Sequence, residues 1–197
     1  MSKPRVILVH GLWMRAPALI YWARGLAKAG FDPVFFSYRS LAQSPEAAIR
    51  RLRNMALQDP DCHVLAHSLG GLIAVKALSG CQGHRGRIVC VGSPLAGSQV
   101  VRRYARTVLG RLAGNNTELL SSGLQAVPEG LSVSVIAGTE PFGIGRMLHR
   151  FQERNDGSVA LSETEIPGLS RHVSVSASHS GQLFSKKVMD QVISLLR

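Results

Sequence analysis

Hydrophobic residues are arranged along the chain in two alternating patterns. Short apolar runs, typical of buried strands, alternate with longer segments in which apolar residues recur every three or four positions. The pattern predicts strands at 5–10, 33–38, 62–66, 87–91, 131–137 and 172–177, and helices at 17–29, 46–58, one ending near 79, 98–113 and 182–196. This alternation predicts a parallel sheet with helices on both faces.

The predicted fold is therefore of the α/β class, with a doubly wound, mostly parallel six-stranded sheet flanked by helices. A chain of 197 residues is long enough for one domain with a substantial core and short for two. No internal repeat or linker divides it, so we expect a single domain over residues 1–197. In the last helix, Phe184 and Val188 are expected to face the core.

The segment 64–71 predicts a nucleophilic serine. Ser68 directly follows a predicted strand and precedes a predicted helix, and a serine lifted above a sheet needs such a sharp turn. The residues two before and two after the serine must be small to avoid a clash, and Ala66 and Gly70 meet this requirement. Gly71 would let the helix approach the sheet closely. The alternative is a serine that only caps a helix.

Three segments resemble the α/β-hydrolase family, and in particular its compact bacterial lipases and esterases. Residues 66–71 (AHSLGG) resemble the nucleophile elbow of these lipases, and residues 10–13 (HGLW) resemble the oxyanion-loop dipeptide. Residues 92–98 (GSPLAGS) resemble the Gly-Thr-Pro-x-x-Gly segment, with Ser93 in place of threonine. The two strands that usually precede the oxyanion strand are absent. The resemblance implies a minimal α/β-hydrolase fold without a large cap domain.

Seven histidines compete for the role of general base. His179 follows the last predicted strand and precedes the last helix, so it belongs to the sheet edge that carries the serine. The order serine, acid, histidine also matches the family. His67 adjoins the serine, but successive residues at a strand end point to opposite faces, so we expect it to be structural. His10 is expected to support the oxyanion loop.

Two carboxylates are candidates for the acid of the triad, which the family places after the penultimate strand. Glu140 follows that strand immediately, whereas Asp156 comes later, in the segment 155–162 (NDGSVALS). The resemblance favours Asp156, because an Asp-Gly-x-Val segment carries the acid in many lipases. Glycine after aspartate also allows a tight turn that presents the carboxylate. A plain Asx turn and the choice of Glu140 are the alternatives.

The resemblance also implies features that have no side-chain signature. Backbone N–H groups of Leu12 and Leu69 would form the oxyanion hole. A small helical lid or cap element is expected at about 98–125. Trp13 is expected to line the acyl pocket, although an aromatic residue at this position could equally belong to the core.

The formal net charge of +11 favours anionic partners but selects none. The arginines are scattered and no nucleic-acid motif accompanies them, so we expect no nucleic-acid partner. The predicted helix 98–113 combines an apolar stripe with four arginines, a pattern that can contact an anionic membrane peripherally. An ordinary surface helix is the alternative.

The cysteines and the amino-terminal residues predict the cellular setting. Cys62, Cys81 and Cys90 form an odd set without metal-ligand spacing, which favours reduced thiols in a cytoplasmic protein and no metal site. The first residues resemble a strand and not a signal peptide, and no apolar run is long enough for a spanning helix. We expect no cofactor and no obligatory protein partner.

Together these residues predict a serine hydrolase that cleaves small-molecule or lipid acyl esters through an acyl-enzyme, as a carboxylesterase or a lipase-like enzyme. A thioesterase or acyltransferase would use the same triad. A non-catalytic relative that serves as a binding module is the third alternative.

Overall fold

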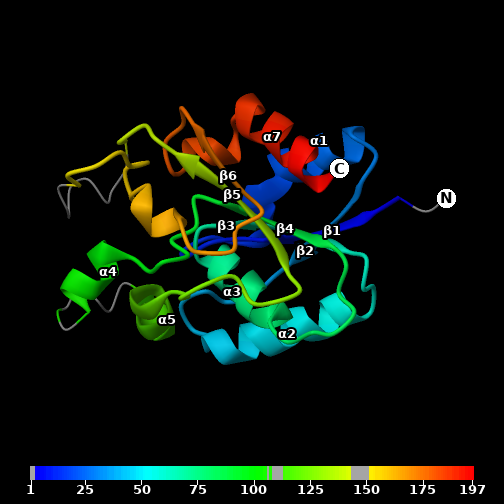
Figure 1. Ribbon diagram of the computed structural model, residues 1–197, viewed down its shortest axis with the longest axis horizontal. Helices are drawn as coiled ribbons and strands as arrows, with labels where there is room; N and C mark the ends of the chain where they lie inside the picture. Colours follow the sequence, from blue (N-terminus) through cyan, green and yellow to red (C-terminus); the bar gives the residue numbers. More distant parts are fainter. Residues whose placement is uncertain (1–2, 106, 108–112, 143–150) are drawn as a thin grey trace.

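A six-stranded parallel sheet organises the computed structural model, which describes residues 3–105, 107, 113–142 and 151–197 (Figure 1). The strand order is β2-β1-β3-β4-β5-β6, and every neighbouring pair is parallel. The bounds are Arg5–Val9 (β1), Asp32–Phe36 (β2), His63–His67 (β3), Arg87–Val91 (β4), Ser132–Gly138 (β5) and Arg171–Val175 (β6). The predicted α/β class and sheet are confirmed.

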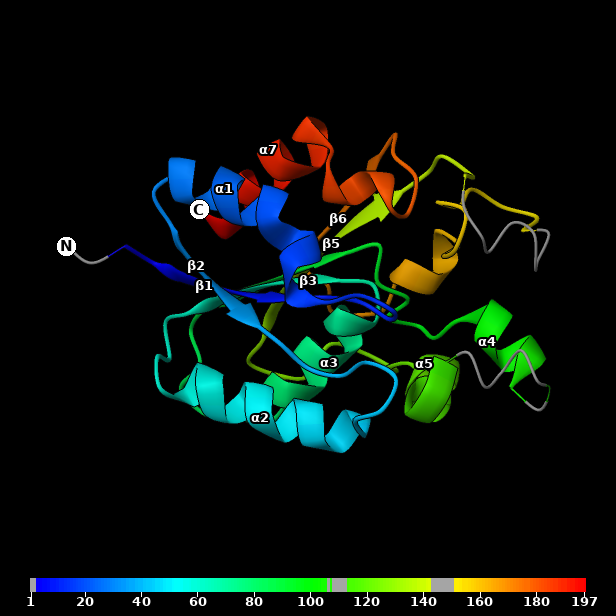
Figure 2. The same cartoon turned by 180° about the vertical axis from the view of Figure 1, so that it is seen from behind.

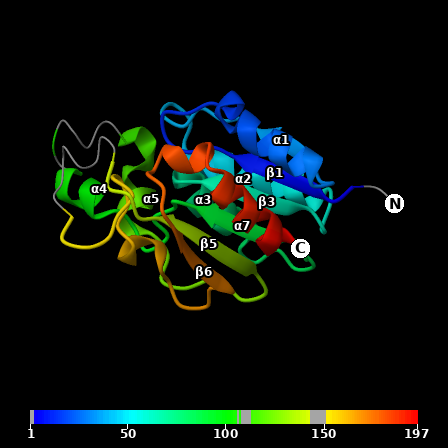
Figure 3. The same cartoon turned by 90° about the horizontal axis from the view of Figure 1, so that it is seen from above.

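Helices cover both faces of the sheet, as Figures 1 and 2 show. Helices α1 (Ile20–Lys28) and α7 (Lys186–Leu196) lie on one face. On the other lie α2 (Pro45–Leu57) and α3 (Leu69–Leu78). The short helices α4 (Gln99–Tyr104) and α5 (Thr117–Ser122) lie together beyond the carboxyl ends of the strands, and Figure 3 shows them on the side of the molecule away from the N-terminus.

The prediction of a last helix over 182–196 is wrong for its first residues. Residues Gly181–Leu183 form a separate 3-10 helix (η4), and α7 begins only at Lys186. The Ser185 hydroxyl accepts a hydrogen bond from the Val188 N–H at 3.4 Å and caps α7. Phe184 falls between the two segments, and its side chain is 63% exposed instead of facing the core. Val188 is buried, as predicted.

The predicted helix 98–113 is also shorter in the structure. Helix α4 ends at Tyr104, after which the Thr107 N–H bonds to the Tyr104 carbonyl at 2.9 Å. Residues 106 and 108–112, on which the rest of that prediction falls, lie outside the described residues. No residue of α4 is fully buried, so it lies on the surface.

Two hydrophobic clusters, one on each face of the sheet, form the core. Residues Val64–Ala66 of β3 are fully buried. Helices cover both faces of the parallel sheet, and this is why the sequence of the strand is a continuous hydrophobic run. In α3 every residue except Lys76 is buried. This helix is covered on one side by the sheet and on the other by α2. In the described parts of the chain, no helix has the length and apolar character needed to cross a membrane.

Glycines allow the turn between β3 and α3 to lie directly against β1. A Cβ atom at Gly70 would lie 2.7 Å from the carbonyl oxygens of both Val9 and His10. A Cβ atom at Gly11 would lie 2.9 Å from the Ser68 Cβ. The end of β1 and the start of α3 therefore make backbone contact, and this fixes where residue 68 lies.

We expect the substitution Gly70→Ala to lower the free energy of unfolding by about 1–3 kcal/mol, as overpacking of a tight site does. The added methyl group would meet backbone oxygens, which cannot move aside as a flexible side chain can. Urea denaturation measures the change, with Lys76→Ala in the same helix as the control. An unfolding free energy equal to that of the wild type would contradict the close approach.

Candidate active site

Ser68 lies at a strained turn between β3, which ends at His67, and α3, which begins at Leu69. Its backbone angles are φ 53° and ψ −124°. Among the described residues other than glycine, Trp13 and Ser68 have positive φ. Such conformations cost about 1–3 kcal/mol each and concentrate at functional sites. The turn that the small neighbours of Ser68 predicted is therefore present.

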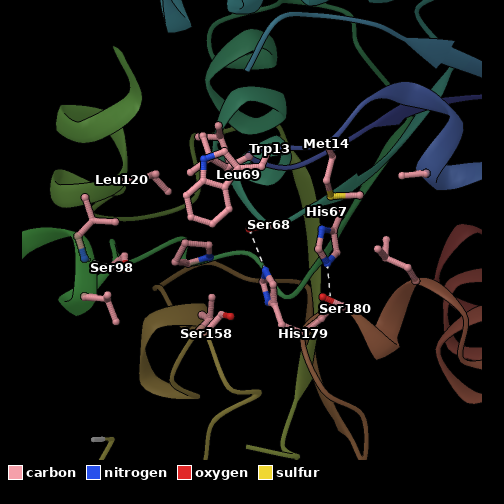
Figure 4. Close-up of a pocket in the computed structure, with 17 residues that line it drawn as sticks. Trp13, Met14, His67, Ser68, Leu69, Ser98, Leu120, Ser158, His179 and Ser180 are labelled. Atoms are coloured by element: carbon pink, nitrogen blue, oxygen red, sulfur yellow. Dashed lines mark hydrogen bonds between the residues drawn. The ribbon is translucent and has the colours of Figure 1, made fainter. Parts of the chain in front are cut away.

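His179 brings its imidazole to the Ser68 hydroxyl from the other end of the chain. It lies in the segment between β6 and η4, and its Nε2 is 3.1 Å from the Ser68 Oγ (Figure 4). Parallel strands end at the same edge of the sheet, so the residues that follow β3 and β6 meet there. Of the candidate histidines, His179 makes this contact.

Asp156 orients the imidazole on its far side. The Asp156 Oδ2 lies 2.7 Å from the His179 Nδ1, and only 1% of the carboxylate side chain is exposed. The other oxygen, Oδ1, accepts hydrogen bonds from the N–H groups of Ser158 at 2.9 Å and Val159 at 2.8 Å. The His179 N–H also bonds to the Asp156 carbonyl at 2.8 Å, which holds the two loops together.

Burial and hydrogen bonding act in opposite directions on the Asp156 carboxyl. Burial alone would raise its pKa, but the His179 imidazole and the N–H groups of Val159 and Ser158 favour the charged form more strongly. The net effect is a pKa below the ordinary value for aspartate. The carboxylate is therefore ionised at neutral pH and can stabilise positive charge on His179.

Gln182 is a site residue that the sequence analysis missed. Its Nε2 donates a hydrogen bond to the Asp156 Oδ2 at 2.9 Å, the same oxygen that faces His179, and the side chain is fully buried. The Gln182 carbonyl in turn accepts a hydrogen bond from the Trp22 indole at 3.3 Å. A glutamine at the start of a predicted amphipathic helix gives no sequence signal that it will bind the carboxylate of Asp156.

Glu163 is a second buried carboxylate that the sequence analysis missed. One of its oxygens accepts a hydrogen bond from the Ala160 N–H at 2.8 Å, and the other accepts one from the N–H of Gln99 in α4. Burial raises the pKa of the Glu163 carboxyl. The residue ties the loop that carries Asp156 to the start of α4.

The other candidate side chains lie elsewhere. Glu140 accepts a hydrogen bond from the Ser176 hydroxyl at 2.7 Å and does not contact His179. His67 is buried and its Nε2 donates to the His179 carbonyl at 3.1 Å, while burial lowers its pKa to about 3 and keeps the ring neutral. His10 stacks on Tyr38, with ring centroids 4.3 Å apart. Both histidines thus pack against the site without reaching the Ser68 hydroxyl.

The backbone groups predicted for an oxyanion hole border Ser68. Leu69 is the first residue of α3, and the first N–H groups of a helix have no acceptor within it. Leu12 follows Gly11, whose backbone lies against Ser68. Both leucines line the cavity that opens at the serine.

That cavity has a volume of about 410 Å³ and is mainly apolar. Trp13 forms part of its wall, with 53% of its side chain exposed, so this aromatic residue is not in the core. Val101 of α4 and Leu120 of α5 also line it. The region 98–125, where a lid was expected, therefore supplies part of the cavity wall. Within the residues that the structure describes, no three His, Cys, Asp or Glu side chains are grouped as metal ligands.

The sequence of this chain matches one protein-family model over most of its length. A sequence model of the alpha/beta hydrolase family matches residues 6–173. The chain belongs to the alpha/beta hydrolase family. No curated protein matches the chain significantly.

Solved structures show how widely this fold is shared. The chain is similar to the mature form of lipase BlEst2 from Bacillus licheniformis, with a TM-score of 0.77 and 19% identity over 99% of this chain and 92% of that one. Against the propeptide form of the same lipase the TM-score is 0.78 at 20% identity, and the match covers 100% of this chain and 51% of that one. This chain therefore spans about half the length of the propeptide form. An enol-lactonase from Burkholderia xenovorans LB400 has a TM-score of 0.69 at 16% identity, over 100% and 92% of the two chains. These identities establish the fold alone.

The lowered pKa of Asp156 predicts how the stability of this protein depends on pH. Its folded pKa lies below the unfolded value of about 3.9. The ionised group therefore contributes stability that is fully present above the unfolded pKa and is lost as the pH falls through the folded pKa. We expect Asp156→Asn to show a shallower loss of unfolding free energy below about pH 4 than the wild type does.

Urea denaturation at a series of pH values measures this slope. Ser68→Ala, which keeps every carboxylate, is the control and should retain the wild-type slope. The same slope in Asp156→Asn and in the wild type would contradict the lowered pKa.

Proposed function

We propose that the protein is a serine hydrolase that cleaves acyl esters through an acyl-enzyme formed on Ser68. The observation that carries the proposal is the continuous hydrogen-bonded chain from the Ser68 Oγ through the His179 imidazole to the Asp156 carboxylate, at 3.1 Å and 2.7 Å. A serine hydroxyl is a weak nucleophile unless a base takes its proton. In this arrangement the base is present and a buried carboxylate orients it.

In the first half of the reaction, the Ser68 Oγ bonds to the ester carbonyl carbon while its proton passes to the His179 Nε2. The electron pair of the carbonyl double bond moves to the oxygen, where the N–H groups of Leu12 and Leu69 stabilise the negative charge. When the double bond re-forms, the bond to the alcohol breaks and the His179 Nε2 gives its proton to the leaving oxygen. While His179 holds the proton, the Asp156 carboxylate carries its negative charge opposite the imidazolium.

In the second half of the reaction, a water molecule takes the place of the alcohol, and the steps of acylation run in reverse. His179 takes a proton from the water as the water oxygen attacks the acyl carbon. It gives this proton to the Ser68 Oγ as the bond between that oxygen and the acyl carbon breaks. The products are a carboxylic acid and the free enzyme. No metal or organic cofactor has a role in these steps.

The apolar cavity beside Ser68 supports an acyl chain as the group bound there, so the proposed activity is that of a carboxylesterase or lipase-like enzyme. Fold similarity to a lipase and to an enol-lactonase agrees with acyl-group chemistry. A thioesterase would use the same residues, and esters and thioesters of one acyl chain separate the two activities. A non-catalytic binding module is disfavoured because it has no need of an oriented imidazole beside a strained serine.

We expect wild-type protein to react with a fluorophosphonate probe and to hydrolyse short-chain acyl esters. Ser68→Ala should abolish labelling and lower kcat/KM by at least about a thousandfold, because the nucleophile is lost. Ser158→Ala is the matched control: its hydroxyl borders the same cavity, but its N–H, which holds Asp156, is kept. Labelling that persists in Ser68→Ala, or wild-type protein that neither labels nor cleaves any ester, would refute the proposal.

A second prediction concerns Gln182, which holds Asp156 without lining the cavity. Gln182→Leu should lower kcat by about tenfold or more, since a hydrogen bond to a charged group contributes about 1.5–3 kcal/mol. KM should stay close to that of the wild type, because no cavity wall changes. Leu183→Ala is the contrasting variant: Leu183 does line the cavity, so its truncation should act mainly on KM. Wild-type kcat in Gln182→Leu would contradict the role of Gln182 as a positioning residue.

A further inference from the structure

A second cavity adjoins the first and differs from it in chemistry. It has a volume of about 830 Å³ and lies between the segment after β1 and the segment 37–43 that follows β2. Trp13 and Met14 line both cavities, and Figure 4 shows both side chains near Ser68. The two cavities therefore adjoin each other at these two residues, and the second is here called the arginine groove.

The charged residues of the arginine groove are all cationic. Of the residues that the structure describes, Arg15, Arg39 and Arg51 line it and no acidic residue does. In the part of the chain that the structure describes, none of the three forms an ion pair with a carboxylate. By contrast, the titratable residues that line the cavity at Ser68 are two histidines, His67 and His179. The two adjoining cavities thus divide into an apolar part and a cationic part.

Hydrogen bonds and a ring contact position the side chain of Arg51 and the backbone of Arg39. The Gln43 Oε1 accepts a hydrogen bond from the backbone N–H of Arg39 at 3.3 Å and one from the Arg51 guanidinium at 3.5 Å. The Arg51 guanidinium also lies over the Phe36 ring, 5.4 Å from its centroid. Because these contacts use the edge and one face of the guanidinium, its remaining N–H groups are available to a ligand.

The loop that carries Arg39 is anchored at several points. The Tyr38 hydroxyl donates a hydrogen bond to the His10 carbonyl at 2.9 Å, next to the predicted oxyanion loop. The buried side chain of Asn116 donates to the Ser40 carbonyl. The backbone of this loop is thus held in place, and Tyr38 ties it to His10 beside the segment that leads to Leu12.

We propose that the arginine groove binds an anionic group on the alcohol side of the substrate, so that the preferred substrates are acyl esters of alcohols carrying a phosphate or carboxylate. This inference rests on the proposed function. The acyl chain occupies the apolar cavity, and the alcohol part passes Trp13 and Met14 toward the groove. Guanidinium groups suit such ligands, because their planar N–H groups match the oxygens of phosphate and carboxylate.

The test compares two esters that share an acyl group, 1-butyrylglycerol and 1-butyrylglycerol 3-phosphate, without vesicles present. For wild-type protein we expect kcat/KM to be at least about tenfold higher for the phosphate ester at low ionic strength. The preference should shrink as salt is added, because salt screens exposed charges. Equal kcat/KM for the two esters would overturn the proposal while leaving the ester-hydrolase function intact.

Variants locate the preference in the groove. Arg39→Gln/Arg51→Gln should remove most of it, chiefly through KM for the phosphate ester, and should leave the neutral ester unaffected. Arg24→Gln/Arg50→Gln is the matched control, because it removes two charges from exposed positions outside the groove and should keep the preference. The reaction of the neutral ester and the Tm of each variant show whether the protein is folded. A preference that survives in the groove variant would overturn the proposal.

Two further measurements distinguish substrate binding in the groove from membrane contact and from turnover at Ser68. Sedimentation with phosphatidylglycerol vesicles tests whether the arginines contact an anionic membrane instead. Vesicle binding that depends on Arg39 and Arg51, together with equal hydrolysis of the two esters, would overturn the proposal in favour of a membrane contact.

Calorimetry with Ser68→Ala tests binding without turnover. Tighter binding of the phosphate ester would support the groove even if the wild type cleaved neither ester, an outcome that refutes only the proposed function.

Discussion

The sharp turn at Ser68 is the constraint on which the rest of the site depends. A non-glycine residue holds a positive φ only where its surroundings leave it no relaxed alternative. Here the Ser68 N–H bonds to the Val91 carbonyl of β4 at 2.9 Å, and the backbone at Gly70 lies against the end of β1. Strands β1 and β4, which flank β3, therefore hold the turn in place. As a result, the Ser68 hydroxyl projects from the sheet edge in one direction.

The imidazole and the carboxylate reach that hydroxyl only because their loops are joined to each other. His179 and Asp156 are linked through side chains and through the His179 N–H, and Gln182 and Glu163 connect the same loops to α1 and α4. A buried carboxylate with several donors stays ionised and has few orientations open to it. The result is a base whose tautomer and direction are set before any ligand binds.

The placement of charge around this site gives the high net charge of +11 a local meaning. Most basic residues, the three arginines of the groove included, are on exposed surface, where charge acts through long-range attraction. In the arginine groove, Arg15, Arg39 and Arg51 gather beside an apolar cavity that opens on Ser68. The two adjoining cavities therefore suit a molecule with an apolar end and an anionic end, the combination on which the substrate proposal rests.

The sequence by itself determined the features that depend on neighbours along the chain. The hydrophobic runs predicted a mostly parallel sheet of six strands, and the small residues around Ser68 predicted its turn, because strand burial and turn sterics are local properties. The choice of His179 over the other histidines followed from its place after the last strand, and Asp156 was preferred to Glu140 only through a resemblance. Even here, the pattern missed the break at Phe184, because apolar periodicity continues across the Ser185 cap.

Tertiary structure alone decided which side chains meet. Gln182 contacts Asp156 across 26 positions of sequence, and His67 supports the His179 loop across 112. The arginine groove joins three arginines from the segment after β1, the loop after β2 and α2, which only the sheet order β2-β1-β3 places side by side. No local pattern encodes such contacts, because they depend on strand register and on how loops close over the sheet edge.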